Sequence, residues 1–299
     1  MDFGHLAENQ LETVHFQLPE DSELTKQVLH YSKRVEVPQV YLGCAKWGRK
    51  EWKGMLYPEK TPEAAFLDEY VKHFNSIELN AVFYGMPKKE QVRNWADKAA
   101  ASGSEFKFCL KFTRSITHLK RLKNAEEETS AYLDAITGFG PYLGPCFLQL
   151  SDNFGPKNFE ILKDYLEKLP RDLKVFVEVR HKDWFEDAEA RKELFAMLHE
   201  LEKGAVITDA AGRRDCVHME LPTPEAFIRF VGNGLHPTDY SRIDEWSSRI
   251  RKWMENGLQS LYFFLHQHDE KNTPLLAAYT IEKLNQISGI SLKVPAVKT

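Results

Sequence analysis

Short apolar runs alternate with longer amphipathic segments along the chain from about residue 40 onward. The runs are rich in Val, Ile, Phe and Tyr, and each has the length of a buried strand. The predicted strands are 40–45, 76–81, 105–112, 146–150, 174–179, 204–209, 226–232 and 260–266. Segments of helical period follow most of them, at about 62–73, 88–101, 125–137, 156–169, 185–202, 241–256 and 274–288. The alternation predicts parallel strands joined by helices.

Eight such units are the number that closes an α/β barrel of the TIM type, so we predict a (β/α)8 barrel with residues 39–299 as one domain. A doubly wound open sheet is the alternative. It often has a Gly-rich first turn, a pattern that residues 45–49 after the first run lack. Residues 210–225 contain two prolines and little helical period, so we expect the sixth helix to be reduced or absent.

Residues 1–38 lie outside this repeat and are expected to form an N-terminal extension on the barrel exterior. The extension should contain one helix near 22–33, capped by Asp21 or Ser22. A second start signal is Thr61, which precedes a proline and should cap the helix that begins there.

Composition limits the partners of the chain. The net charge is −4 and the pI is about 6.3, so no overall positive field favours general nucleic-acid binding. No apolar run approaches the roughly 18 residues that a membrane span needs, and we expect a cytoplasmic protein. The four cysteines lie far apart, which is typical of reduced, buried thiols. Nothing in the composition identifies a cofactor or an oligomeric state.

Most of the predicted strands end in polar side chains, and these ends build the active sites of barrels. The candidates are Glu78, Asn80, Lys111, Gln149, Glu178, Arg180, Asp209, Arg229 and His266. Because side chains alternate across a strand, those of one parity should converge inside the barrel. Burying such charges costs several kcal/mol each unless they are paired or hydrated, so the rim is either a salt-bridged plug or a binding site. Its position favours a small-molecule site.

The loop after the fifth strand carries the densest chemistry. Glu178 could act as a general base or acid, Arg180 could bind an anionic oxygen, and His181 could move a proton near neutral pH. The structural alternative is a Glu178 ion pair, with His181 and Trp184 at the start of the next helix.

Aromatic side chains follow the first two strands. Trp47 and Tyr84 are candidates for lining the pocket, where flat rings suit sugars or bases, whereas Trp52 and Tyr57 are expected to cover the barrel end. The basic segment 112–123 makes an anionic ligand plausible, although a solvated basic loop is the simpler explanation.

Metal and serine-hydrolase chemistry have weaker support. His266 and His268 could bind a metal together with a carboxylate, but the spacing H-E-x-x-H does not occur, and we predict no metal site. A serine nucleophile would need the elbow G-x-S-x-G, which is also missing.

The motifs GCAKW, ELNAVFYGMP, FCLKF, GPCFLQLSDNF, VEVRHKDW and IRFVG occur in this order over about residues 40–266. In this order they resemble the YecE-like family, a domain of unknown function, and the resemblance implies a TIM-type barrel without an established activity. The residues that match its recurrent positions are Trp47, Glu78, Asn80, Tyr84, Lys111, Gln149, Glu178, Arg180, His181, Trp184 and Arg229. The chain departs from the family pattern at 231–233 and 266–268, so roles that depend on those positions do not transfer.

We therefore expect a protein that binds a small polar, anionic or sugar-like ligand at the carboxyl ends of the strands. Carboxylate acid/base chemistry is the leading hypothesis, and its candidate catalytic residues are Glu78, Glu178, Arg180, His181 and Asp209. The candidate binding residues are Trp47, Asn80, Tyr84, Lys111, Gln149, Trp184, Arg229 and His266. Two alternatives remain: a binding or scaffold protein without turnover, and a metal-assisted isomerase- or endonuclease-like barrel.

Overall fold

The computed structural model describes residues 3–103 and 105–298. Residues 1, 2, 104 and 299, which fall in the expected extension and barrel domain, lie outside the described residues. Each predicted strand is found in place. The strands are β1 (Gln39–Cys44), β2 (Ser76–Leu79), β3 (Lys107–Leu110), β4 (Cys146–Gln149), β5 (Val175–Glu178), β6 (Gly204–Asp209), β7 (Glu225–Gly232) and β8 (Ser260–Gln267).

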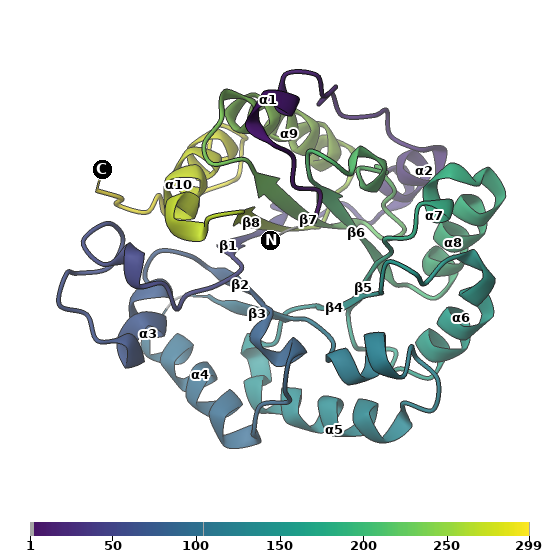
Figure 1. Ribbon diagram of the computed structural model, residues 1–299, viewed down its shortest axis with the longest axis horizontal. Helices are drawn as coiled ribbons and strands as arrows, with labels where there is room; N and C mark the ends of the chain where they lie inside the picture. Colours follow the sequence, from purple (N-terminus) through teal and green to yellow (C-terminus); the bar gives the residue numbers. More distant parts are fainter. Residues whose placement is uncertain (1–2, 104, 299) are drawn as a thin grey trace.

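The strands form two parallel sheets. Six of them pair in the order β1-β8-β7-β6-β5-β4, and β2 pairs with β3. Figure 1 shows both sheets curving around a common centre, with the helices on the outside. The fold is therefore α/β with parallel strands, as the alternating pattern predicts.

Contacts on both sides join the two sheets. Lys111, just after β3, forms an isolated parallel bridge with Phe147 of β4. On the other side, the Asn75 side chain accepts a hydrogen bond from the Leu42 amide and donates one to the Val40 carbonyl, both at 2.8 Å. Each edge of the two-stranded sheet thus contacts an edge of the six-stranded sheet.

Alternation along the strands explains the interior. One parity points to the centre, where large rings fill the space, and the other packs against the helices. The central cluster consists of Tyr41, Cys109, Phe147, Phe176, Val206, Phe227, Tyr262 and Phe264. All four cysteines are buried and free. The centre is therefore a packed core, and polar side chains of the same parity lie above it at the carboxyl ends.

The helices also follow the predicted order. They are α1 (Glu8–Leu11), α2 (Glu23–Tyr31), α3 (Phe66–Tyr70), α4 (Lys89–Ala101), α5 (Glu126–Ile136), α6 (Phe159–Glu167), α7 (Asp183–Glu186), α8 (Ala188–Glu200), α9 (Pro237–Asn256) and α10 (Thr273–Leu284). None of the helices in the described part of the chain is both long and apolar enough to cross a bilayer.

The segment between β6 and β7 lacks an α-helix, as predicted. Residues 210–225 contain only the short turn Arg214–Cys216. Helix α2 of the N-terminal extension lies between α8 and α9 instead (Figure 1). The Thr25 hydroxyl donates to the Met219 carbonyl at 2.8 Å and accepts from the Leu221 amide at 2.7 Å. The extension thus occupies the place that the missing helix leaves open.

The two predicted helix caps have different outcomes. The Ser22 side chain accepts from the Thr25 amide at 3.1 Å, so the predicted cap of α2 is confirmed. The predicted Thr61 cap is wrong. Pro62 is itself extended and precedes the turn Glu63–Ala65, which has no side-chain cap. An extended proline moves the first helical position beyond the reach of the Thr61 hydroxyl.

Candidate functional site

A buried group of charges lies above the central cluster. Arg229 of β7 lies between Glu78 of β2 and Glu178 of β5. Its Nη2 and Nε donate to Glu78 at 2.8 and 2.9 Å, and its Nη1 donates to Glu178 at 2.8 Å. All three side chains are almost fully buried. The sequence thus correctly predicts a convergence of strands far apart in the chain.

Four further side chains surround the two carboxylates. Together with Glu78, Glu178 and Arg229 we call them the central network. Arg180 Nε donates to Glu178 at 2.9 Å, Thr208 Oγ1 donates to Glu178 at 3.2 Å, Asn80 Nδ2 donates to Glu78 at 2.7 Å, and His266 Nε2 lies 2.9 Å from Glu78. Both carboxylates are therefore saturated with partners, as buried charges require.

These contacts fix the charge of both glutamates. Burial alone would raise the pKa of Glu78, but the charges of Arg229 and His266 outweigh burial and hold this pKa well below its usual range. Burial also raises the pKa of Glu178, but the charges of Arg180 and Arg229 lower it more, so the net effect is a lowered pKa. Neither glutamate holds a proton near neutral pH, so neither can act there as a general acid.

Lys111 lies beside the central network but is not joined to it by an ion pair. Its side chain follows β3 and is 9 % exposed, and its Nζ is 3.9 Å from the centre of the Phe83 ring. Within the described residues, no hydrogen bond or ion pair of its ammonium group is found. Burial, followed by the charge of Arg229, lowers the pKa of Lys111 to about 7.

A second ionisable side chain lies near Lys111. The His118 ring contacts the Phe83 ring, with ring centres 5.0 Å apart. Burial and the charges of Lys111 and Arg180 lower the pKa of His118 to about 4. At neutral pH His118 is therefore uncharged. Because the two glutamates are paired with two arginines, the remaining positive charge is that of Lys111 in its protonated form.

An aromatic pocket of about 350 Å³ lies next to this group. Trp47, Asn80 and Tyr84 line it, so the structure brings together three residues predicted to bind ligand. Asn80 connects the pocket to the central network through its bond to Glu78. The Tyr84 ring contacts the Phe83 ring, which also contacts Lys111. The volume falls within the usual range for small-molecule sites.

Two predicted residues have structural contacts. The His181 ring packs on Gly155, where an added Cβ would be 3.0 Å from it, and His181 Nδ1 accepts from the Asp183 amide at 3.2 Å. Trp184 is fully buried, and its Nε1 donates to the Phe154 carbonyl at 2.8 Å. These contacts agree with the structural alternative for this loop rather than with a catalytic role for His181 or a ligand-binding role for Trp184.

Gln149, by contrast, occupies an inward position. It pairs in register with Glu178 across β4 and β5 and is 3 % exposed. The structure thus places Gln149 at the same level as the central network.

Asp209 belongs to a second group, which we call the peripheral network. Its carboxylate accepts from Arg242 Nη2 and from Trp246 Nε1, both at 2.7 Å, and it also contacts Arg214. Its place on β6 has the parity of Ile207, which packs outward, so the side chain faces α9. The structure therefore does not bring Asp209 to the other predicted site residues.

Several residues around the central network are not among the predicted site residues. Thr208 is the inward residue of β6, but residues 204–209 are buried on both faces, so their pattern does not show whether Thr208 or Asp209 points inward. Phe83 and His118 lie in loops whose paths the strand pattern does not fix. The strand pattern thus carried no signal for any of these three residues.

The N-terminal segment supplies another unforeseen contact. The Phe3 ring lies 3.9 Å from the guanidinium carbon of Arg180, and 5.0 Å from that of Arg213. The Gly4 carbonyl accepts from the Gly212 amide at 2.9 Å. Gly4 has a positive φ, and a Cβ there would be 2.7 Å from the Cβ of Ala210. Residues 3 and 4 thus contact the loops around the site.

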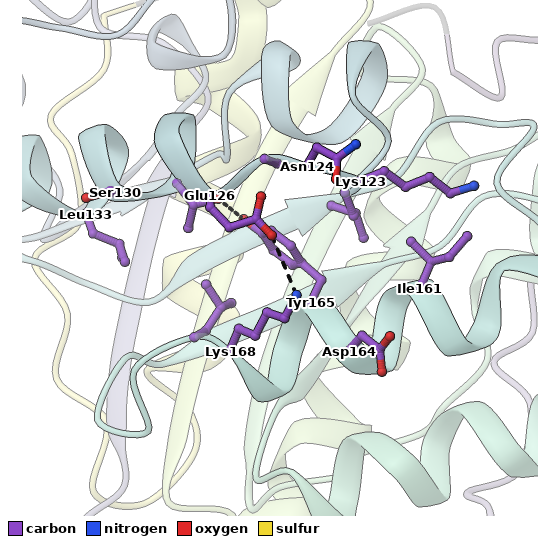
Figure 2. A pocket seen from close by; sticks show the side chains of 13 residues that line it. Lys123, Asn124, Glu126, Ser130, Leu133, Ile161, Asp164, Tyr165 and Lys168 are labelled. Atoms are coloured by element: carbon purple, nitrogen blue, oxygen red, sulfur yellow. Dashed lines mark hydrogen bonds and ion pairs between the residues drawn. The ribbon is translucent and has the colours of Figure 1, made fainter.

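A larger hollow of about 480 Å³ lies between α5 and α6 (Figure 2). Its contacts are a hydrogen bond of 2.8 Å between the hydroxyls of Thr129 and Tyr165 and an exposed ion pair between Glu126 and Lys168. Exposed pairs contribute little binding energy, so this groove is a weaker candidate than the strand ends. Among the described residues, no group of three or more His, Cys, Asp or Glu side chains could hold a metal ion.

Comparisons with known proteins place the chain in a family. Residues 41–298 match the family described as "Protein of unknown function DUF72". The chain is 28% identical over 276 residues to the UPF0759 protein YecE of Escherichia coli (strain K12), covering 86% of this chain and 97% of that one. It is 26% identical over 156 residues to the UPF0759 protein YunF of Bacillus subtilis (strain 168), covering 49% and 52% of the two chains.

Solved structures agree on the fold. A DUF72 family protein from Enterococcus faecalis V583 matches 85% of this chain and 99% of its own, with a TM-score of 0.63 and 17% identity. A second, from Thermotoga maritima MSB8, matches 83% and 99%, with a TM-score of 0.60 and 21% identity. At these identities the likeness shows the fold alone.

Proposed function

The chain belongs to the DUF72 family, and we propose that it is a closed (β/α)8 barrel whose mouth binds a small anionic or sugar-like metabolite. Residues 39–299 would form the barrel domain and residues 1–38 its extension. The bridge between Lys111 and Phe147 supports closure on one side of the two-stranded sheet. On the other side, a Cβ at Gly43 would be only 1.9 Å from the Ser76 carbonyl oxygen, so β1 and β2 pass very close together.

The charge balance of the mouth carries the ligand proposal. Lys111, Arg180 and Arg229 face the carboxylates of Glu78 and Glu178, and both carboxylates are bound by the arginines. An anionic group on the ligand would complete the balance, with Arg180 as its first contact because 12 % of this side chain is exposed. Trp47 and Tyr84 would contact the flat face of a sugar.

In this proposal the acid/base group is Lys111 rather than Glu78 or Glu178. Glu78 and Glu178 are held ionised and fully paired, so they balance charge and orient the arginines. Lys111 changes its charge near neutral pH, which is the property that a proton-transfer group needs. His181 and Asp209 have no part in this proposal because their contacts direct them elsewhere.

A thermal-shift titration tests the binding proposal. Inorganic phosphate and a hexose 6-phosphate should raise the melting temperature of the parent protein with increasing concentration. Arg180→Met should abolish this response. Arg191→Met is the matched control and should retain it, because Arg191 is also bound to a glutamate, Glu220, but lies outside the site. No response in the parent, or equal responses in all three proteins, would overturn the proposal.

A further inference from the structure

We propose that Lys111 is a nucleophile, and that its amine forms an imine with a small aldehyde or ketone that carries a carboxylate or phosphate. The inference rests on the proposed function, since the anionic group is what the mouth would bind. It extends that function by naming a covalent step and the chemical class of the reacting group.

The pairing pattern separates Lys111 from the other buried cations, since even Lys203, for which no carboxylate partner is found among the described residues, donates to the Leu173 carbonyl at 3.2 Å. Arg229 has two carboxylate partners, and Arg242 has Asp209. Lys111 has the Phe83 ring instead. The neighbouring arginines bind the carboxylates of Glu78 and Glu178, because each guanidinium group offers several donors in a fixed planar arrangement. An amine in this position has a free lone pair whenever it loses its proton.

The surroundings of Lys111 favour that loss. Burial is the largest influence, and Arg229 and Arg180 add repulsion, while Glu178 and Glu78 oppose them less strongly. The resulting pKa of about 7 means that about half of the molecules carry a neutral amine at neutral pH. An ordinary lysine, with a pKa of about 10.4, is almost entirely protonated there. A desolvated lysine is a known way to obtain a reactive amine in a protein.

The step balances without an oxidant or a reductant. The lysine nitrogen attacks the carbonyl carbon, and a proton from nitrogen passes to the carbonyl oxygen, which gives a carbinolamine. Loss of the second nitrogen proton with that hydroxyl releases one water and leaves a C=N bond. Protonation of the imine creates a cation, which the negative charge of Glu178 would stabilise. Arg180 would hold the anionic group of the same molecule.

Reductive trapping tests the step. The full-length protein is incubated with glyoxylate and cyanoborohydride at pH 7, and the modified lysines are mapped by peptide mass spectrometry. Lys111 should be carboxymethylated at least about tenfold faster than the other lysines, given its larger neutral fraction. Its rate should level off above about pH 8, and phosphate should slow it.

Two variants serve as controls. Lys111→Arg should remove the preferred modification, whereas Lys107→Arg should not, because Lys107 begins β3 and Lys111 follows the opposite end of that strand. If phosphate binds through Arg180 but Lys111 reacts no faster than surface lysines, the imine proposal fails and the binding proposal stands. If neither phosphate binding nor preferred trapping occurs, both fail.

From a separate observation we infer that the N-terminal segment covers the mouth. Phe3 lies over Arg180, the residue proposed to meet the anion, and His5 packs against His268 with ring centres 4.2 Å apart. Leu11 is 2 % exposed, so it anchors α1. The family match begins only at residue 41, and the cover is therefore an addition to the part of the chain that matches the family.

The cover should compete with an anion for Arg180. Phe3→Ala should therefore bind inorganic phosphate about two- to fivefold more tightly, the equivalent of one partly exposed cation–π contact. Phe16→Ala is the matched control, because Phe16 stacks on Arg242 and Arg214 of the peripheral network, and it should leave the affinity unchanged. Equal or weaker binding by Phe3→Ala, in a protein whose parent does bind phosphate, would overturn the inference.

Discussion

Two buried networks of charge lie at the carboxyl ends of the strands, and they differ in the groups beside them. The peripheral network joins β6 to α9, and Asp209 is bound by two arginines and one indole N–H. The central network joins β2, β5, β6, β7 and β8. Lys111 lies beside it and has no carboxylate partner among the residues that the structure describes. Buried charge is therefore common to both networks, and the cation beside the central network is the feature on which the site proposal depends.

Replacing the arginine at the centre of each network should give the largest difference in stability between the two networks. Arg229→Met leaves Glu78 and Glu178 without their shared cation and should lower the free energy of unfolding by about 3–5 kcal/mol. Arg242→Met should cost less, because Asp209 keeps Arg214 and Trp246. Urea denaturation measures both.

The opposite order would contradict the comparison. If Arg229→Met yields no folded protein, adding Glu78→Gln should restore part of the stability, since it removes one of the two uncompensated carboxylates. No gain from the second substitution would count against the central network as described.

Replacing one carboxylate in each network should distinguish an effect on stability from an effect on the reactivity of Lys111. Asp209→Asn and Glu78→Gln should each cost about 1.5–3 kcal/mol, the loss of hydrogen bonds to a charged group. Only Glu78→Gln should move the pH midpoint of Lys111 trapping, and it should move it down, because the Glu78 charge raises the pKa of Lys111. An equal shift in Asp209→Asn would remove the distinction between the networks.

Lys111 should also influence stability as a function of pH. Its folded pKa of about 7 lies below its unfolded value, so the unfolded chain binds more protons between about pH 7 and 10.4. Stability should therefore rise with pH across this window, by up to a few kcal/mol. Unfolding free energies at pH 6.5 and 9 should show a smaller rise in Lys111→Met than in Lys107→Met. Identical rises would show that Lys111 is not perturbed.

The glutamates predict a rise of stability with pH in the acid range as well. Their folded pKa values lie below the unfolded value of about 4.3, so their stabilising contribution is complete above that pH and is lost as the pH falls through the folded values. Glu78→Gln should reduce this acid-dependent loss, measured by urea denaturation between pH 3 and 6. An unchanged loss would mean that other carboxylates cause it.

The smallest expected effect concerns Thr208. Thr208→Val removes one donor to Glu178, which keeps Arg180 and Arg229. The bond is long, at 3.2 Å, so the cost should lie at the low end for a hydrogen bond to a charged group, about 1.5 kcal/mol. Denaturation should detect this loss while the trapping rate of Lys111 stays close to that of the parent. A large change in trapping would give Thr208 a role in orienting Glu178.

The sequence predicts the order of elements and much of the site. Strand positions follow from apolar runs, and alternation along β5 and β7 identifies Glu178 and Arg229 as candidates for the inward face. The pattern is silent on β6, where residues 204–209 are buried on both faces, because a strand covered on both sides shows no alternation. The inward residue at its end is Thr208, and the Asp209 side chain faces α9 instead.

The kinds of elements that form are local properties of the chain, since the strand and helix periods and the helix-poor segment 210–225 can all be read from neighbouring residues. The pairing of the charges is a property of the fold. The partners Glu78 and Arg229 are 151 residues apart, and their contact depends on how the two sheets come together, which no local pattern encodes. The charge state of Lys111 has the same origin, because it depends on how completely the distant Arg180 and Arg229 occupy the carboxylates of the central network.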